Sequence, residues 1–171
     1  MEIKKIILVY KKSILQLYSG KNKKSLFSKL LDENDITIHT LKESHIEHTK
    51  SLDTIINTLD KTGINVSLVP KGKAFDEKAY DLVLTAGGDG TFLETSHFVQ
   101  NKPILGINTS PSYSVGYYCG ADANNLKLKI ERIQEGKLSL SSLMRLTFKI
   151  NNSDYSIRVL NDILFAGSSP A

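Results

Sequence analysis

Several features that would narrow the class of protein are missing from this sequence of 171 residues. Cys119 is its only cysteine, so an internal disulfide is excluded. The longest apolar run, residues 6–10, is too short for a membrane span or for the core of a signal peptide. We therefore expect a cytoplasmic protein without a membrane partner.

Arginine is absent from the basic N-terminal segment, residues 1–31. This segment holds eight lysines and a single acidic residue, Glu2, whereas the whole chain has a net charge of only +4. A basic segment attracts phosphorylated ligands, and the alternative interpretation is a solvated, lysine-rich face. Because aromatic and basic residues do not interleave there, we expect no nucleic-acid binding.

Short apolar runs rich in β-branched residues alternate with helical patterns along most of the chain. The predicted strands are residues 3–10, 64–69, 81–86 and 104–108. Strands that alternate with helices favour an α/β fold with an open, mostly parallel sheet and helices on both faces. No internal repeat or low-complexity segment interrupts this pattern.

A helix is predicted between the first two of these strands. Ser44 and Glu47 have the spacing of a capping box, and Gly63 is a suitable C-terminal stop. The apolar residues between them recur at helical spacing: Leu52, Ile55, Ile56 and Leu59. We expect a further short helix at residues 21–31 and a loop or extended connection at residues 32–41.

The pattern changes toward the C-terminal end. Residues 126–136 predict a helix, and the runs 143–150 and 155–160 alternate around an Asn-Asn-Ser-Asp turn, as in a β-hairpin. We therefore predict two domains. Residues 1–140 form an α/β nucleotide-binding domain, and residues 141–171 begin an antiparallel, β-rich domain that is incomplete.

The stretch YDLVLTAGGDGTFLETSHFV, residues 80–99, predicts a strand, a glycine-rich turn and a helix. Such a turn suits phosphate, because glycines admit a ligand and a helix N-terminus offers free N–H groups. It lacks the Gly-Lys-Ser/Thr of a P-loop, and Leu93 replaces the third glycine of a dinucleotide fingerprint. An ionised Asp89 beside phosphates costs free energy unless something compensates for the repulsion. Either Mg²⁺ bridges the charges, or Asp89 accepts a proton in phosphoryl transfer. The alternative is an ordinary tight turn.

Three motifs occur in order along the chain: GGDGT at 87–91, ILGINTSPSYSVGYY at 104–118 and LNDILFAGSSPA at 160–171. Together they resemble NAD kinases, which phosphorylate the 2′-hydroxyl of the adenosine ribose of NAD. The similarity is greatest to the divergent branch of plant NADH kinases and mitochondrial NAD kinases. The resemblance implies the fold of NAD kinases and phosphofructokinases, NAD(H) and ATP or polyphosphate as substrates, Mg²⁺ with ATP, and a homodimer or homotetramer.

The resemblance also implies roles for individual residues. Asp89 would be the general base, or orienter, for the ribose 2′-hydroxyl. The phosphate loop would consist of Gly87, Gly88, Gly90 and Thr91. Tyr117 would lie against the adenine of NAD, Asn161 would hydrogen-bond it, Asp162 would hold ribose hydroxyls, and Asn108 is a further site candidate. Asp162 departs from the family, which usually has the longer Glu there. The alternatives are that Tyr117 belongs to the core and that Asn161 is a turn residue.

Other polar residues give weaker functional signals. A zinc site could be suggested for His39, His45 and His48, but no cysteine or dependable fourth ligand lies near them in the sequence. We therefore interpret these histidines as exposed polar residues near the start of a helix. We predict no protein metal site. Cys119 lacks an activating partner and is interpreted as a small buried residue.

The order of the motifs predicts an NAD(H) kinase that forms NADP(H). The alternatives are another GGDGT kinase, acting on a lipid or a sugar, and a non-enzymatic nucleotide-binding remnant. NAD kinases continue well beyond the point at which this chain stops, and a lone hairpin is marginal in water. We therefore also expect the 171 residues to be a fragment without kinase activity of its own.

Overall fold

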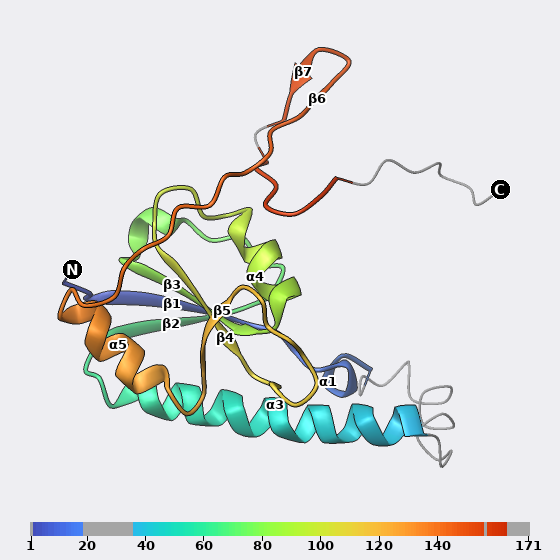
Figure 1. Cartoon of the computed structure of the whole chain (residues 1–171), viewed down its shortest axis with the longest axis vertical. Coiled ribbons are helices and arrows are strands. Elements are labelled where there is room, and N and C mark those ends of the chain that lie inside the picture. Colours follow the sequence, from blue (N-terminus) through green and yellow to red (C-terminus); the bar gives the residue numbers. More distant parts are fainter. Residues whose placement is uncertain (1, 19–35, 156, 164–171) are drawn as a thin grey trace.

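A parallel five-stranded sheet forms the centre of the computed structural model, which describes residues 2–18, 36–155 and 157–163 (Figure 1). The strand order is β2-β1-β3-β4-β5. The strands are β1 (Lys5–Tyr10), β2 (Asn65–Pro70), β3 (Leu82–Gly87), β4 (Ile104–Asn108) and β5 (Cys119–Asp122). All four neighbouring pairs are parallel, so the predicted open parallel sheet is confirmed.

The central strand β3 is buried along its whole length, LVLTAG. Strands of a parallel sheet that is covered on both faces read as continuous apolar runs, because each side chain meets a layer whichever way it points. Pairing of β1 with β3 places Ile7 opposite Val83 and Leu8 opposite Leu84, all inaccessible to solvent. The apolar run therefore explains why this strand lies in the middle.

Helices cover both faces of the sheet, as the sequence predicts (Figure 1). On one face, α3 (Ile36–Asp60) and α5 (Leu126–Gln134) bury apolar side chains against β1 and β3. The other face is covered by α4 (Asp89–Ser96), followed by Val99, which packs in a second apolar cluster. Two short helical segments, α1 (Ile14–Tyr18) and η1 (Glu77–Ala79), complete this part of the chain.

The long helix α3 begins earlier than predicted. Residues 36–41 are helical, so the prediction of a loop there is wrong, and the predicted helix at 21–31 lies outside the described residues. Ser44 and Glu47 lie inside α3 and do not form a capping box. They contact the segment after β4 instead: the Ser44 carbonyl accepts from the Ser110 hydroxyl at 3.4 Å, and Glu47 Oε1 accepts from the Ser112 hydroxyl at 2.9 Å.

The segment after α5 runs back past α4 and ends in a hairpin that projects from the sheet (Figure 1). Its ladder consists of β6 (Lys149–Ile150) and β7 (Ser153–Asp154), with one further antiparallel bridge between Leu146 and Val159. The predicted antiparallel structure is confirmed, but it is short. The domain boundary near residue 140 stays a prediction. No helix in the described parts of the chain is long and apolar enough to span a bilayer.

Candidate functional site

The GGDGT turn lies at the carboxyl edge of the sheet, where β3 passes directly into α4. The chain proceeds from β1 outward to β2 in one direction and from β3 to β4 and β5 in the other. Ligands of open α/β sheets bind at such a reversal, outside the carboxyl ends of the strands. The turn therefore occupies the position at which a ligand site is expected.

The glycines of the turn are required for different reasons. A Cβ on Gly87 would overlap the side chain of Thr91, which is itself buried. A Cβ on Gly88 would lie 2.7 Å from the hydroxyl oxygen of Ser114. Gly90 is exposed and faces open space, so nothing within the described structure demands a glycine there. The role of Gly90 in a phosphate loop stays a prediction.

Asp89 is the first residue of α4, and its carboxylate holds a second loop. Its Oδ2 accepts the backbone N–H of Tyr117 at 2.9 Å, and its Oδ1 accepts that of Tyr118 at 2.7 Å. A negative charge at a helix N-terminus is stabilised by the helix dipole. The structure thus brings together two residues that the sequence separates, the predicted base and the predicted adenine-stacking residue.

Tyr117 is 82% exposed, which excludes the alternative that this residue belongs to the core. It meets Tyr118 edge to face, with ring centroids 5.3 Å apart, and Tyr118 in turn stacks on Phe92 of α4 at 5.4 Å. Aromatic pairs of this kind are stabilising and fix the ring positions. Tyr117 is therefore an exposed aromatic residue that packs against a supporting aromatic pair.

Asn108 supports the loop that carries Tyr117. It is 7% exposed; its amide nitrogen donates to the Ser114 carbonyl at 2.8 Å, and its amide oxygen accepts from the Ser110 N–H at 3.1 Å. Gly116 has a positive φ of 64°, and a Cβ there would press against the Asn108 amide. The side-chain amide of Asn108 is thus occupied by the loop.

Asn161 and Asp162 follow the bridge at Val159 and are both exposed. Within the described part of the chain, no hydrogen bond or ion pair joins either side chain to the GGDGT turn. Their proposed contacts with adenine and ribose stay predictions.

A family model described as the ATP-NAD kinase N-terminal domain matches residues 6–138. The chain belongs to the ATP-NAD kinase family. The predicted resemblance to NAD kinases is thereby confirmed for this part of the chain. The matched range contains the turn, the Tyr117 loop and nearly the whole sheet, and it ends before Asn161.

Individual NAD kinases show the same similarity. The chain is 34% identical over 107 residues to "Probable NADH kinase" of Oryza sativa subsp. japonica, covering 53% of this chain and 33% of that protein. It is 43% identical over 84 residues to "NAD kinase 2, mitochondrial" of Homo sapiens, covering 46% of this chain and 19% of that protein. "NADH kinase" of Arabidopsis thaliana is 34% identical over 88 residues, or 42% and 28% of the two chains. The matched part thus spans a third or less of these relatives.

His48 is a structural residue of this NAD kinase domain that sequence reasoning missed. It is buried, so its interpretation as an exposed polar residue is wrong. Its Nε2 donates to the Lys11 carbonyl at 3.0 Å, and its Nδ1 accepts from the Thr109 hydroxyl at 2.8 Å. Burial, followed by the nearby charge of Lys11, lowers the pKa of His48, which favours the neutral ring. Its helical spacing from Leu52 was the available signal.

The described residues contain neither an activated cysteine nor a group of side chains arranged as a metal site. Burial, with a smaller contribution from the Asp89 carboxylate, raises the pKa of the Cys119 thiol to about 11. The thiol is therefore protonated at neutral pH and is no activated nucleophile. In the described ranges, no three His, Cys, Asp or Glu residues are grouped as a metal site would need.

Proposed function

We propose that the protein acts as an NAD(H) kinase, transferring a phosphoryl group from ATP or polyphosphate to the 2′-hydroxyl of the adenosine ribose of NAD(H). One observation carries the proposal: the Asp89 carboxylate, at the start of α4, is hydrogen-bonded to the backbone of Tyr117 and Tyr118. A ligand whose adenine stacks on the exposed Tyr117 ring would have its ribose near this carboxylate. The names of the related NADH and NAD kinases agree with this chemistry.

In the proposed reaction Asp89 accepts the proton of the 2′-hydroxyl. The hydroxyl oxygen forms a bond to the terminal phosphorus, while the bond from that phosphorus to the leaving phosphate oxygen breaks. Each carboxylate oxygen of Asp89 accepts one N–H bond and retains a further lone pair, so a hydroxyl can still bond to it. Asn161 would read the adenine edge, and Asp162 would hold ribose hydroxyls.

The phosphate chain would lie against the turn formed by Gly87, Gly88, Gly90 and Thr91, where Gly90 leaves open space. Mg²⁺ would accompany ATP and, when bound, would neutralise charge on the phosphates. Phosphate oxygens and water would supply most ligands of this ion, because Mg²⁺ keeps several waters and binds largely through substrate phosphates. A homodimer or homotetramer, a cytoplasmic location and the lack of nucleic-acid and membrane partners stay predictions.

The direct test is NADP(H) formation from NAD or NADH with Mg²⁺ and either ATP or polyphosphate. Phosphorylation of diacylglycerol without phosphorylation of NAD(H) would replace the proposal with a lipid kinase. Absence of any phosphoryl transfer by the protein would leave only nucleotide binding.

Asp89→Asn would have two effects, because it removes the proposed base and also disturbs the hydrogen bonds to the Tyr117 loop. An amide has one acceptor oxygen, so its NH₂ would face one of the two N–H groups of Tyr117 and Tyr118. We expect turnover to fall about 100- to 10,000-fold from loss of the base, with weaker NAD binding from the loosened loop. Gly116→Ala is the matched control: it should disturb the loop and raise KM while leaving kcat nearly unchanged.

Tyr117 gives a second test of the proposed adenine contact. Because its ring is exposed, Tyr117→Ala should disturb the fold little and weaken NAD binding by about 1–3 kcal/mol, as for stacked bases elsewhere. Tyr117→Phe retains the ring and should bind almost normally. Equal losses for the two variants would assign the contact to the hydroxyl and refute stacking.

A further inference from the structure

Two lysines lie side by side at the carboxyl edge of the sheet, next to the GGDGT turn. The Lys11 N–H donates to the Ala86 carbonyl at 3.1 Å, and the Lys71 N–H donates to the Tyr10 carbonyl at 2.8 Å. Lys11 therefore lies between Lys71 on one neighbouring strand end and Gly87 on the other. This is also the point at which the strand order reverses.

The charges of these lysines are not fully compensated. The Lys71 ammonium forms an ion pair with Glu94 of α4 at 3.0 Å. Lys11 is half-buried, and in the described part of the chain it has no ion pair. Burial, followed by the charge of Lys71, lowers the pKa of Lys11. A partly buried ammonium beside a second cation costs free energy unless an anion lies close, so the arrangement favours an anionic ligand.

The start of α4 contributes to the same positive region. Its N-cap is Gly88, which has no side chain to occupy the free N–H groups of the first turn. Gly90 beside it faces open space. The two acidic groups of α4 are already engaged: Asp89 accepts the N–H groups of Tyr117 and Tyr118, and Glu94 pairs with Lys71.

A solvated lysine is the competing explanation, and Lys12 fits it because it is exposed. Lys11 differs in its burial and in its position between Lys71 and Gly87. We propose that Lys11, with Lys71 beside it, binds the phosphate chain of the phosphoryl donor, whether ATP or inorganic polyphosphate supplies that chain. The inference rests on the proposed kinase function and extends it to residues outside the GGDGT motif.

The test compares Lys11→Met with Lys12→Met, which removes a neighbouring but exposed charge. Titration calorimetry at low salt measures binding of inorganic tripolyphosphate and, separately, of ATP with Mg²⁺ to the protein. Loss of one charge-assisted contact should weaken binding of each probe about tenfold for Lys11→Met. Lys12→Met should stay within about twofold of the unaltered protein, as expected for a screened surface charge.

Two further variants keep the test independent of folding defects. Lys11→Arg retains the charge and should recover most of the affinity, and melting temperatures show whether each variant is folded. Glu94→Gln removes the partner of Lys71 and should strengthen tripolyphosphate binding by about two- to threefold. Unchanged binding by folded Lys11→Met, or weaker binding by Glu94→Gln, overturns the inference. Weakened binding of ATP but not of tripolyphosphate also overturns it, because the contact would then involve the nucleoside.

NADP(H) formation by the unaltered protein separates this inference from the proposed function. If NADP(H) forms and Lys11→Met binds both probes normally, the lysine site is wrong and the kinase function stands. If no donor gives NADP(H) but tripolyphosphate binding still depends on Lys11, the kinase function is wrong and the lysine site stands.

Discussion

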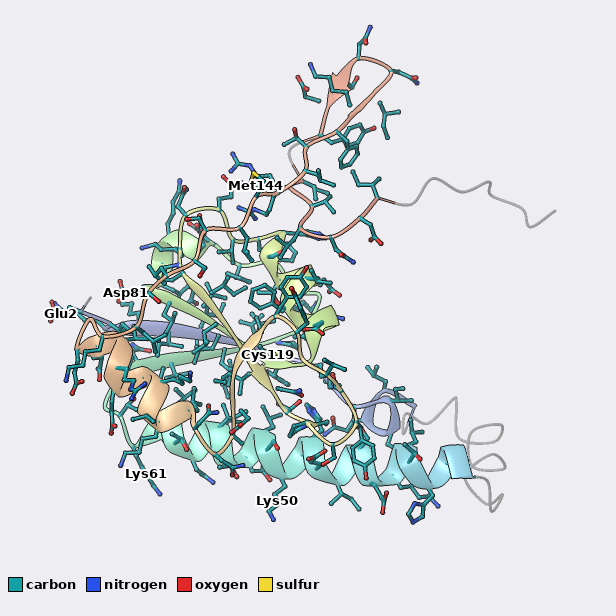
Figure 2. All side chains as sticks on the ribbon, in the orientation of Figure 1. Glu2, Lys50, Lys61, Asp81, Cys119 and Met144 are labelled. Carbon is teal, nitrogen blue, oxygen red and sulfur yellow. The ribbon has the colours of Figure 1, made fainter. Side chains whose placement is uncertain are left out.

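The strands of the sheet and those of the hairpin carry similar apolar side chains but bury them to different extents. In β3, Leu84 is completely inaccessible, whereas Leu146 in the hairpin segment is 52% exposed and Met144 is 95% exposed. Figure 2 shows Met144 on the segment that leaves the sheet. The sheet lies between helices on both faces. In the described residues, no second layer covers the hairpin. An apolar run therefore predicts a strand, but its burial depends on what packs against it.

The two regions also differ in how they are held. Sheet strands are joined by parallel ladders of up to six residue pairs. The hairpin segment is tied to the sheet domain by the Arg145 guanidinium, which donates to the carbonyls of Ser96 at 2.8 Å and of Val99 at 2.5 Å. Ser96 is the last residue of α4, where a cation also complements the helix dipole.

The largest difference should appear when the same substitution is made in both regions. Leu84→Ala removes a fully buried side chain between two layers and should lower the free energy of unfolding by about 2–5 kcal/mol. Leu146→Ala removes a half-exposed side chain and should cost less than about 1 kcal/mol. Urea denaturation followed by circular dichroism measures both. Equal losses would mean that the hairpin is covered in solution.

Removal of the Arg145 contact should have a smaller effect, confined to the hairpin segment. Arg145→Met leaves the carbonyls of Ser96 and Val99 without this donor and should cost about 1–2 kcal/mol. Amide hydrogen exchange should become faster between residues 143 and 159 and stay unchanged in β3. Arg158→Met, at an exposed arginine of the same segment, is the control and should leave exchange unaltered. Faster exchange throughout the sheet would contradict a local role.

The smallest effect is a pH dependence that belongs to the sheet domain. Because the pKa of His48 is lowered in the fold, the unfolded chain takes up a proton first as pH falls below about 6.5. Stability should therefore be level above that pH and decrease below it, by at most about 1.4 kcal/mol per pH unit. His48→Gln should remove this dependence, and His39→Gln, at an exposed position, should retain it. A slope that persists in His48→Gln would point to another group.

Local sequence patterns were sufficient for much of the fold. Four of the five sheet strands were predicted within two residues at each end, because buried parallel strands are short apolar runs. The fifth strand, β5, was missed: its sequence, Cys-Gly-Ala-Asp, has no strand pattern, and pairing with β4 creates it. The start of α3 was also missed. Tertiary contacts lie close to this start: Glu43 accepts from the Tyr113 hydroxyl, and Glu47 accepts from the Ser112 hydroxyl.

The candidate site likewise has features that the sequence predicts and features that depend on the tertiary structure. The sequence by itself determined that a strand, the GGDGT turn and a helix follow one another, because these features depend on neighbouring residues. Only the tertiary structure decided that Asp89 holds the backbone of Tyr117, 28 positions away, and that Lys11, Lys71 and Gly87 meet at one edge. The physical reason is that strand order and loop packing determine which distant residues lie close together. Burial of the whole sheet between its helices supplies the free energy that stabilises this arrangement.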